Sequence, residues 1–193
     1  DMSLKEGNKK TFHGEGGLGL ISSRLTLEGP LKKERSSFLI SGRRTYADII
    51  LAPWMQENFT VGYFFYDLNA KLNFELNGKN KIHLSSYVGN DRFFLKEKYR
   101  DQELSAGINW GNATGTLRWN HLFNNRLFSN MSLIYSDYKL GISANETVQN
   151  NVFELGIGSG IRDLIFKTDF DYFPLPGHHI KSGISITWHH FTP

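Results

Sequence analysis

Residues 66–77 alternate strictly between two kinds of side chain, and this alternation constrains the fold more than any other feature. Every even-numbered position from Tyr66 to Leu76 is apolar, whereas every odd-numbered position from Asp67 to Asn77 is polar or charged. Since successive side chains of a β-strand point to opposite faces of a sheet, the run predicts a strand with one apolar and one polar face. Soluble β-sandwiches and membrane β-barrels both use such strands.

Similar alternation elsewhere predicts an all-β chain, an antiparallel meander of about nine strands with almost no helix. The Asn77-Gly78 pair favours a tight hairpin, and the segment 47–65 fits a long loop that can include one helical turn. The predicted strands cover about 11–20, 24–28, 36–46, 66–77, 82–94, 104–120, 127–142, 152–173 and 180–188, with a tight reversal near Ser22-Ser23.

Some of these strands change the phase of their alternation part of the way along. In 104–120 the apolar residues fall on even positions before Gly111-Asn112 and on odd positions after it. A slip of one residue moves every later side chain to the opposite face, so a continuous strand predicts a bulge at this glycine. Two short strands joined by a bend are the alternative, and 127–142 and 152–173 contain similar changes of phase.

The connections are predicted to differ in length between the two ends of the meander. Turns at 29–36, 78–81, 123–127 and 174–179 are short, and loops at 47–65, 95–103 and 143–151 are longer. This asymmetry, the strands longer than about 12 residues and the aromatic residues near many turns are typical of outer-membrane barrels. The pattern therefore favours a segment of a large transmembrane outer-membrane β-barrel over a soluble sandwich.

Composition excludes several classes of protein. The 193 residues have a mean hydropathy of −0.38 and 39% hydrophobic residues, and no stretch approaches the roughly 20 apolar residues of a membrane helix. In a membrane barrel, polar residues alternate with the lipid-facing apolar ones, so the low mean hydropathy does not exclude a barrel. The absence of cysteine argues against disulfide scaffolds and Cys-ligated metals, and the net charge of +3 is too dispersed to indicate nucleic-acid binding.

The sequence gives little support for a catalytic site or a metal site. The pairs His178-His179 and His189-His190 are the obvious metal candidates, but the second lies on a strand, where neighbouring side chains point to opposite faces and cannot jointly chelate one ion. No Ser/His/Asp or paired-carboxylate arrangement is predicted to converge. We expect neither an enzyme nor a bound cofactor or metal.

Several runs resemble the junction between plug and barrel, and the first barrel strands, of TonB-dependent outer-membrane transporters of Bacteroidetes (SusC-like). None is diagnostic alone, but their order is fairly specific and spans essentially the whole chain. They are LKEGN at 4–8, FHGEGG at 12–17, SSRLTLEGP at 22–30, SGRRTY at 41–46, WGN at 110–112, LRWNH at 117–121 and HHFTP at 189–193.

The resemblance implies that residues 1–10 are the end of the plug domain and its linker, and that 11–193 are the N-terminal part of the barrel. Family barrels have about 22 strands, so we expect a fragment, and neither end looks like a natural terminus. The resemblance also implies that the first strand rises from the periplasm, with short turns periplasmic and longer loops extracellular.

The alternation divides the expected wall into two sets of side chains. The set facing the lumen is predicted to form a hydrated wall, whose charges form ion pairs with the plug and with one another. This set comprises Arg24, Glu28, Asp67, Lys71, Glu75, Arg118, Lys167, Asp169 and Lys181. The set facing lipid comprises Leu68, Leu72, Phe74, Leu76, Ile184, Ile186 and Trp188.

The resemblance implies an active importer in the cell outer membrane, taking up a nutrient such as an oligosaccharide, a peptide or a metal chelate. Its implied partners are membrane lipid, the rest of the barrel and its plug, TonB and a surface lipoprotein lid. The alternative is a transporter-fold scaffold subunit of a larger outer-membrane or secretion complex. A complete small barrel with an enzymatic or adhesive role is a weaker third interpretation.

Overall fold

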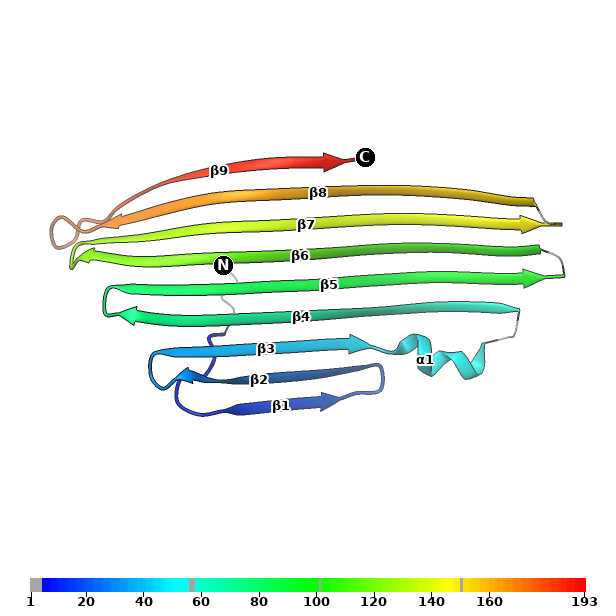
Figure 1. The fold of residues 1–193 in the computed structure, drawn as a ribbon, viewed down its shortest axis with the longest axis horizontal. Helices are drawn as coiled ribbons and strands as arrows, with labels where there is room; N and C mark the ends of the chain where they lie inside the picture. The colour runs from blue at the N-terminus through cyan, green and yellow to red at the C-terminus, as the bar shows by residue number, and fades with distance from the viewer. Residues whose placement is uncertain (1–4, 56–57, 101, 150) are drawn as a thin grey trace.

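The protein folds into one layer of nine antiparallel strands (Figure 1). The computed structural model describes residues 5–55, 58–100, 102–149 and 151–193, and its strands follow one another in space in chain order. The prediction of an all-β antiparallel meander is therefore confirmed. The edge strands β1 and β9 are not paired with each other, so the sheet is open.

The strands lengthen from the N-terminal edge toward the middle of the sheet, and β4 to β8 are the long ones in Figure 1. The bounds are β1 His13–Leu18, β2 Ser22–Lys32, β3 Ser36–Thr45, β4 Phe59–Asn77, β5 Asn80–Tyr99, β6 Gln102–Asn124, β7 Leu127–Val148, β8 Asn151–Tyr172 and β9 Ile180–Thr192. The connections β2–β3, β4–β5, β6–β7 and β8–β9 all lie at one end of the sheet, hereafter the turn end.

A short helical segment joins β3 to β4. It consists of α1 (Ala47–Leu51) and the 3₁₀ turn η1 (Ala52–Trp54), so the expected helical turn is present. The loop predicted over 47–65 is too long, because β4 already begins at Phe59. Over the described ranges, no helix has the length and apolar character needed to cross a bilayer.

The predicted loops at 95–103 and 143–151 are wrong. Strand β5 continues to Tyr99 before β6 begins at Gln102, and β7 continues to Val148 before β8 begins at Asn151. Most residues of these segments are polar, which hid them from a search for alternation. The described residues nevertheless stay paired, as far as Tyr99 with Gln102 and Val148 with Asn151. The predicted difference in loop length is therefore confined to the β3–β4 connection.

The predicted bulge at Gly111-Asn112 is also wrong. Gly111 pairs with Asn90 and Lys139, and the register of β6 with both neighbours continues unbroken past it. The register shifts found along the described strands lie beside turns, at Pro30/Lys32, Glu75/Asn77 and Leu122/Asn124. The strand is therefore regular, and the change of phase means that its apolar side chains move from one face of the sheet to the other.

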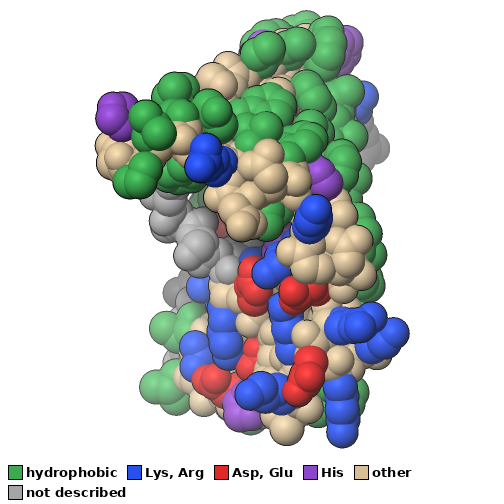
Figure 2. All heavy atoms as spheres, turned by 90° about the vertical axis from the view of Figure 1, so that its left-hand side faces the viewer, with side chains coloured by type: hydrophobic (Ala, Val, Ile, Leu, Met, Phe, Trp, Pro, Cys, Tyr) green, Lys and Arg blue, Asp and Glu red, His purple; other side chains and the backbone are tan. Residues whose placement is uncertain are grey.

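The sheet has no core of its own. None of the described hydrophobic side chains is buried, and the buried residues are polar, including Glu28, Ser37, Asn73 and Ser129. Seen from the turn end (Figure 2), charges of both signs gather over the lower half of the molecule, and hydrophobic side chains cover the upper half. A sheet normally packs its apolar face against a second layer, and the residues that the structure describes form none.

The unbroken register of β6 can be tested by cross-linking, since the chain has no native cysteine. Ser105 lies opposite Asn145 beyond Gly111, so the pair Ser105→Cys with Asn145→Cys is expected to form a disulfide on mild oxidation. Ser105→Cys with Ala144→Cys is the control, because Ala144 points to the other face. Faster cross-linking of the control pair would show that a bulge shifts the strand.

Candidate functional site

The register assigns every strand residue to one of two faces, because directly paired residues project to the same side of a sheet. We call the side with Leu72 and Ile186 the belt face and the side with Lys71 and Asp169 the wall face. All the predicted lumen residues lie on the wall face, and the predicted lipid residues lie on the belt face except Leu76, which falls at a register shift.

The belt face carries an apolar stripe across the half of the sheet nearer the turns. Its most regular row crosses seven strands through direct pairs: Phe38, Leu72, Leu84, Leu117, Leu133, Phe166 and Ile186. The neighbouring row toward the turns joins Phe74, Ile82, Trp119, Met131, Thr168 and Ile184. Most of these side chains are exposed or half-buried, so the stripe is an apolar surface that the described residues leave uncovered.

Aromatic residues lie toward both ends of the stripe. Trp119 is near the turn end, where its Nε1 donates a hydrogen bond to Asn80 Oδ1 at 3.0 Å. Tyr135 and Trp188 flank Leu164 in a row farther from the turns. An indole with an apolar body and a bonded N–H is suited to the boundary between hydrocarbon and water.

Beyond the stripe the two faces exchange character. The row Asn90, Gly111, Lys139 and Gly160 marks the change on the belt face. Polar residues and glycines follow it, together with Phe64 and Phe94. On the wall face the same stretch becomes apolar, with Phe93 paired to Ile108 and Ile108 to Ile142. On β7 to β9 the change comes one row earlier, at Asp137, Arg162 and His190. Neighbouring strands thus change within one row of each other, so the exchange is a property of the sheet. We call the row through Gly111 the polarity switch.

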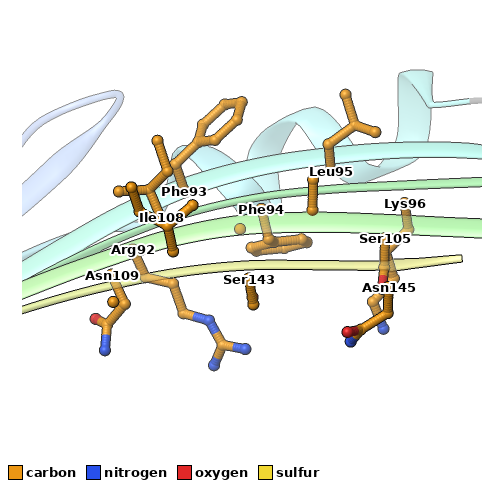
Figure 3. A pocket seen from close by; sticks show the side chains of 14 residues that line it. Arg92, Phe93, Phe94, Leu95, Lys96, Ser105, Ile108, Asn109, Ser143 and Asn145 are labelled. Carbon is orange, nitrogen blue, oxygen red and sulfur yellow. The ribbon is translucent and has the colours of Figure 1, made fainter. Parts of the chain in front are cut away.

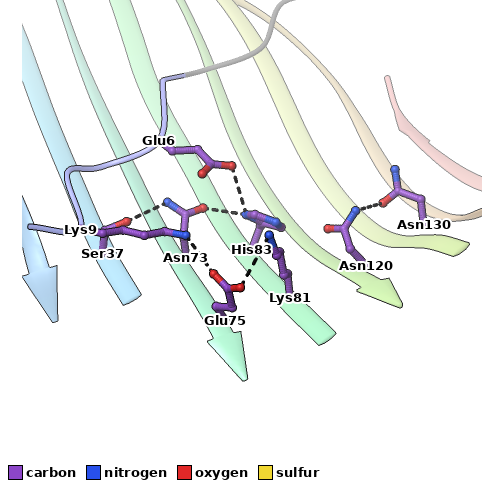
Figure 4. Close-up of polar contacts among 9 residues, drawn as sticks. All are labelled: Glu6, Lys9, Ser37, Asn73, Glu75, Lys81, His83, Asn120 and Asn130. Carbon is purple, nitrogen blue, oxygen red and sulfur yellow. Dashed lines mark hydrogen bonds and ion pairs between the residues drawn. The ribbon is translucent and has the colours of Figure 1, made fainter. Parts of the chain in front are cut away.

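The N-terminal segment lies across the polar part of the wall face (Figure 4). Lys5 Nζ contacts Glu28 Oε1 at 2.8 Å, and Lys9 Nζ contacts Glu75 Oε2 at 3.3 Å. The Glu34 N–H donates to the carbonyl of Lys9 at 3.0 Å. A β-carbon at Gly7 would overlap the carbonyl of Phe38. Charge pairs and a close backbone approach therefore hold this segment on the wall.

A polar chain beneath this segment links three strands. Asn73 Nδ2 donates to Ser37 Oγ at 3.3 Å, and Asn73 Oδ1 lies 2.7 Å from Nδ1 of His83. A carboxylate oxygen of Glu6 approaches the same His83 nitrogen at 3.9 Å. Glu6, Asn73, Lys81 and His83 border a hollow of about 400 Å³ on the wall.

Elsewhere the wall side chains mostly pair with one another. Arg43 Nη2 lies 2.7 Å from Asp67, and Lys167 lies 3.3 Å from Asp169. Sequence reasoning named Asp67, Lys167 and Asp169 but missed Asn73 and His83 on the same face, whose partners depend on the strand register.

The histidine pairs do not form a chelating site. His189 Nδ1 lies 2.7 Å from Asp163 on the wall face, whereas His190 is paired with Arg162 on the belt face. His179 contacts Asp171 at 2.6 Å near the last turn. Within the described part of the chain, no group of three or more His, Cys, Asp or Glu side chains is placed to hold a metal ion.

Comparison with known proteins gives no assignment. No model of a protein family matches the chain, and no curated protein matches it significantly.

Docking of the N-terminal segment should depend on Gly7. Gly7→Ala is expected to lift residues 5–10 from the wall, because the new methyl overlaps the Phe38 carbonyl, and trypsin should then cleave faster after Lys9. Gly156→Ala is the matched control, since a β-carbon there meets open space. Equal cleavage of both variants and the parent would contradict this docking.

Proposed function

We propose that this chain forms part of the wall of an outer-membrane β-barrel that imports a nutrient in a TonB-dependent manner. The observation that carries the proposal is the apolar row through Leu72, Leu117 and Phe166 on a sheet that no second layer covers within the described part of the chain. Hydrocarbon would solvate this row, while the wall face would meet water and protein. A barrel of strands is one of the two architectures that satisfy their backbones in lipid.

The dimensions of the stripe support a membrane position. From Phe74 to Tyr66 on the belt face, β4 advances roughly 26 Å, or about 20 Å along the membrane normal if tilted as in known barrels. Outer-membrane barrels carry an apolar band about 25 Å tall, crossed by about 9–11 residues. Strand β6 has 23 residues, so a strand of this length would cross the band and continue beyond the membrane from the polarity switch.

The partners follow from the open edges and the docked segment. In a bilayer, β1 and β9 would each need a further neighbour, from the same chain or from a partner. The family resemblance makes residues 1–10 the end of a plug, and the ion pairs of Lys5 and Lys9 with the wall support this. By the same resemblance the turn end is periplasmic, TonB acts on the plug, and a surface lipoprotein covers the barrel.

A scaffold subunit of a larger outer-membrane complex is the second candidate. It is favoured by the apolar wall face beyond the polarity switch, where Phe93, Ile108 and Ile142 lie together. An apolar inner surface is suited to packing against protein more than to lining a hydrated passage.

Membrane position can be measured by labelling single cysteines in the full-length protein reconstituted in vesicles. Leu117→Cys and Leu133→Cys lie on the stripe, and Ser105→Cys and Ser143→Cys lie on the same face beyond the switch. The serine-site thiols should react with a membrane-impermeant maleimide roughly tenfold faster or more, because the reactive thiolate does not form in hydrocarbon. Equal rates in vesicles, after normalisation to denatured protein, would contradict the membrane assignment.

Transport can be separated from scaffolding by binding to TonB. The full-length protein is expected to retain the purified C-terminal domain of TonB, and deletion of a TonB-box segment upstream of the plug should abolish retention. An upstream region without such a segment, or full-length protein that does not bind, would favour the scaffold.

A further inference from the structure

A groove opens on the belt face just beyond the polarity switch, across β5, β6 and β7 (Figure 3). It has a volume of about 560 Å³. The belt-face side chains that border it are Arg92, Phe94, Lys96, Ser105, Asn109, Ser143 and Asn145. Figure 3 shows Phe93 and Leu95 pointing away from Arg92 and Asn109, as expected for alternate residues of a strand. The groove therefore belongs to the same side of the sheet as the apolar stripe.

Glycines give the groove its shape. Phe94 is paired with Gly62 on one side and with Gly107 on the other. A β-carbon at Gly62 would overlap the Phe94 ring, so the ring lies over this glycine. Gly107 and Gly141 carry no side chain beside Ser143 and Asn109. The result is an aromatic surface bordered by hydroxyl and amide groups.

The charges in and around the groove are mainly positive. Neither Arg92 nor Lys96 forms an ion pair with the carboxylates that the structure describes. Asp137, nearer the stripe, is contacted by Lys139 at 3.4 Å and Arg162 at 3.5 Å. Two other carboxylates lie on the belt face of this stretch. Glu154 is on the Lys96 row three strands away, roughly 14 Å, and Glu103 is opposite Lys98, one belt-face position past Ser105 on β6.

We propose that this groove binds the phosphorylated headgroup of a glycolipid in the outer leaflet. Arg92 and Lys96 suit phosphate oxygens, because guanidinium and ammonium groups form charge-assisted hydrogen bonds with them. Asn109, Ser143 and Asn145 can bond sugar hydroxyls, and the face of Phe94 can pack against the apolar side of a sugar ring.

The position of the groove favours a lipid over a soluble phosphate compound. Arg92 lies roughly 13 Å along β5 from Val88, the last apolar belt residue before the switch. A lipid with acyl chains on the stripe would therefore present its headgroup at the groove. This inference rests on the proposed membrane position of the stripe, because only then does the groove lie at headgroup level.

The test measures lipid binding by the full-length protein in detergent, using native mass spectrometry with lipopolysaccharide as the probe and phosphatidylcholine as reference. Lipopolysaccharide is expected to bind in preference, and the double variant R92Q/K96Q should weaken its binding about tenfold or more. K167Q/K181Q, which removes two wall-face cations, should leave it unchanged. Phe94→Ala should weaken binding, whereas Phe93→Ala, on the opposite face, should not.

Three results would overturn the inference. They are equal binding of lipopolysaccharide and phosphatidylcholine, equal effects of the groove and wall variants, and displacement of the glycolipid by millimolar inorganic phosphate, which would indicate a soluble ligand. The labelling of Leu117→Cys and Ser143→Cys in vesicles separates the two proposals. A protein that inserts as proposed but lacks glycolipid preference contradicts the groove alone, and a protein that fails to insert contradicts the proposed function.

Discussion

The absence of a buried hydrophobic side chain among the described residues governs everything else about this sheet. Folding must compensate the conformational entropy lost along strands of 20 residues or more, and apolar burial is the main favourable term. A single layer cannot supply that burial from its own side chains. Lipid on the belt face and protein on the wall face would supply it, and within the membrane the ladder of backbone hydrogen bonds would be satisfied within the sheet.

The polarity switch divides the strands, along their length, into two levels with different apolar faces. Near the turns, Leu117 and Leu133 face one way while Arg118 and Ser132 face the other; farther along, Ile108 and Ile142 take the opposite side. A regular strand can pass from one environment to another in this way without a change in its backbone, because the side chains on its two faces are chosen independently. The same strands would thus form a membrane wall at one level and an extramembrane wall at the next, with an apolar interior suited to contact with other protein.

Local alternation was enough to predict the strands and most of their faces. The run from Asp67 to Glu75 identified its sheet faces directly, and the register later grouped Arg118 and Lys181 with it. Alternation failed where most residues are polar, as at 95–103, because pairing there depends on the neighbouring strands. It also suggested a bulge at Gly111, because a phase change in one strand looks the same whether the backbone slips or the surroundings change. Only the alignment of neighbouring strands separates the two explanations.

The most direct test of the two-faced wall is the depth of its tryptophans in a bilayer. Variants of the full-length protein retaining only Trp188 or only Trp110 place one indole on the stripe and one on the opposite face beyond the switch. Lipids brominated along their acyl chains should strongly quench the fluorescence of Trp188 and leave that of Trp110 nearly unchanged. Equal quenching of the two, or none of Trp188, would contradict the account.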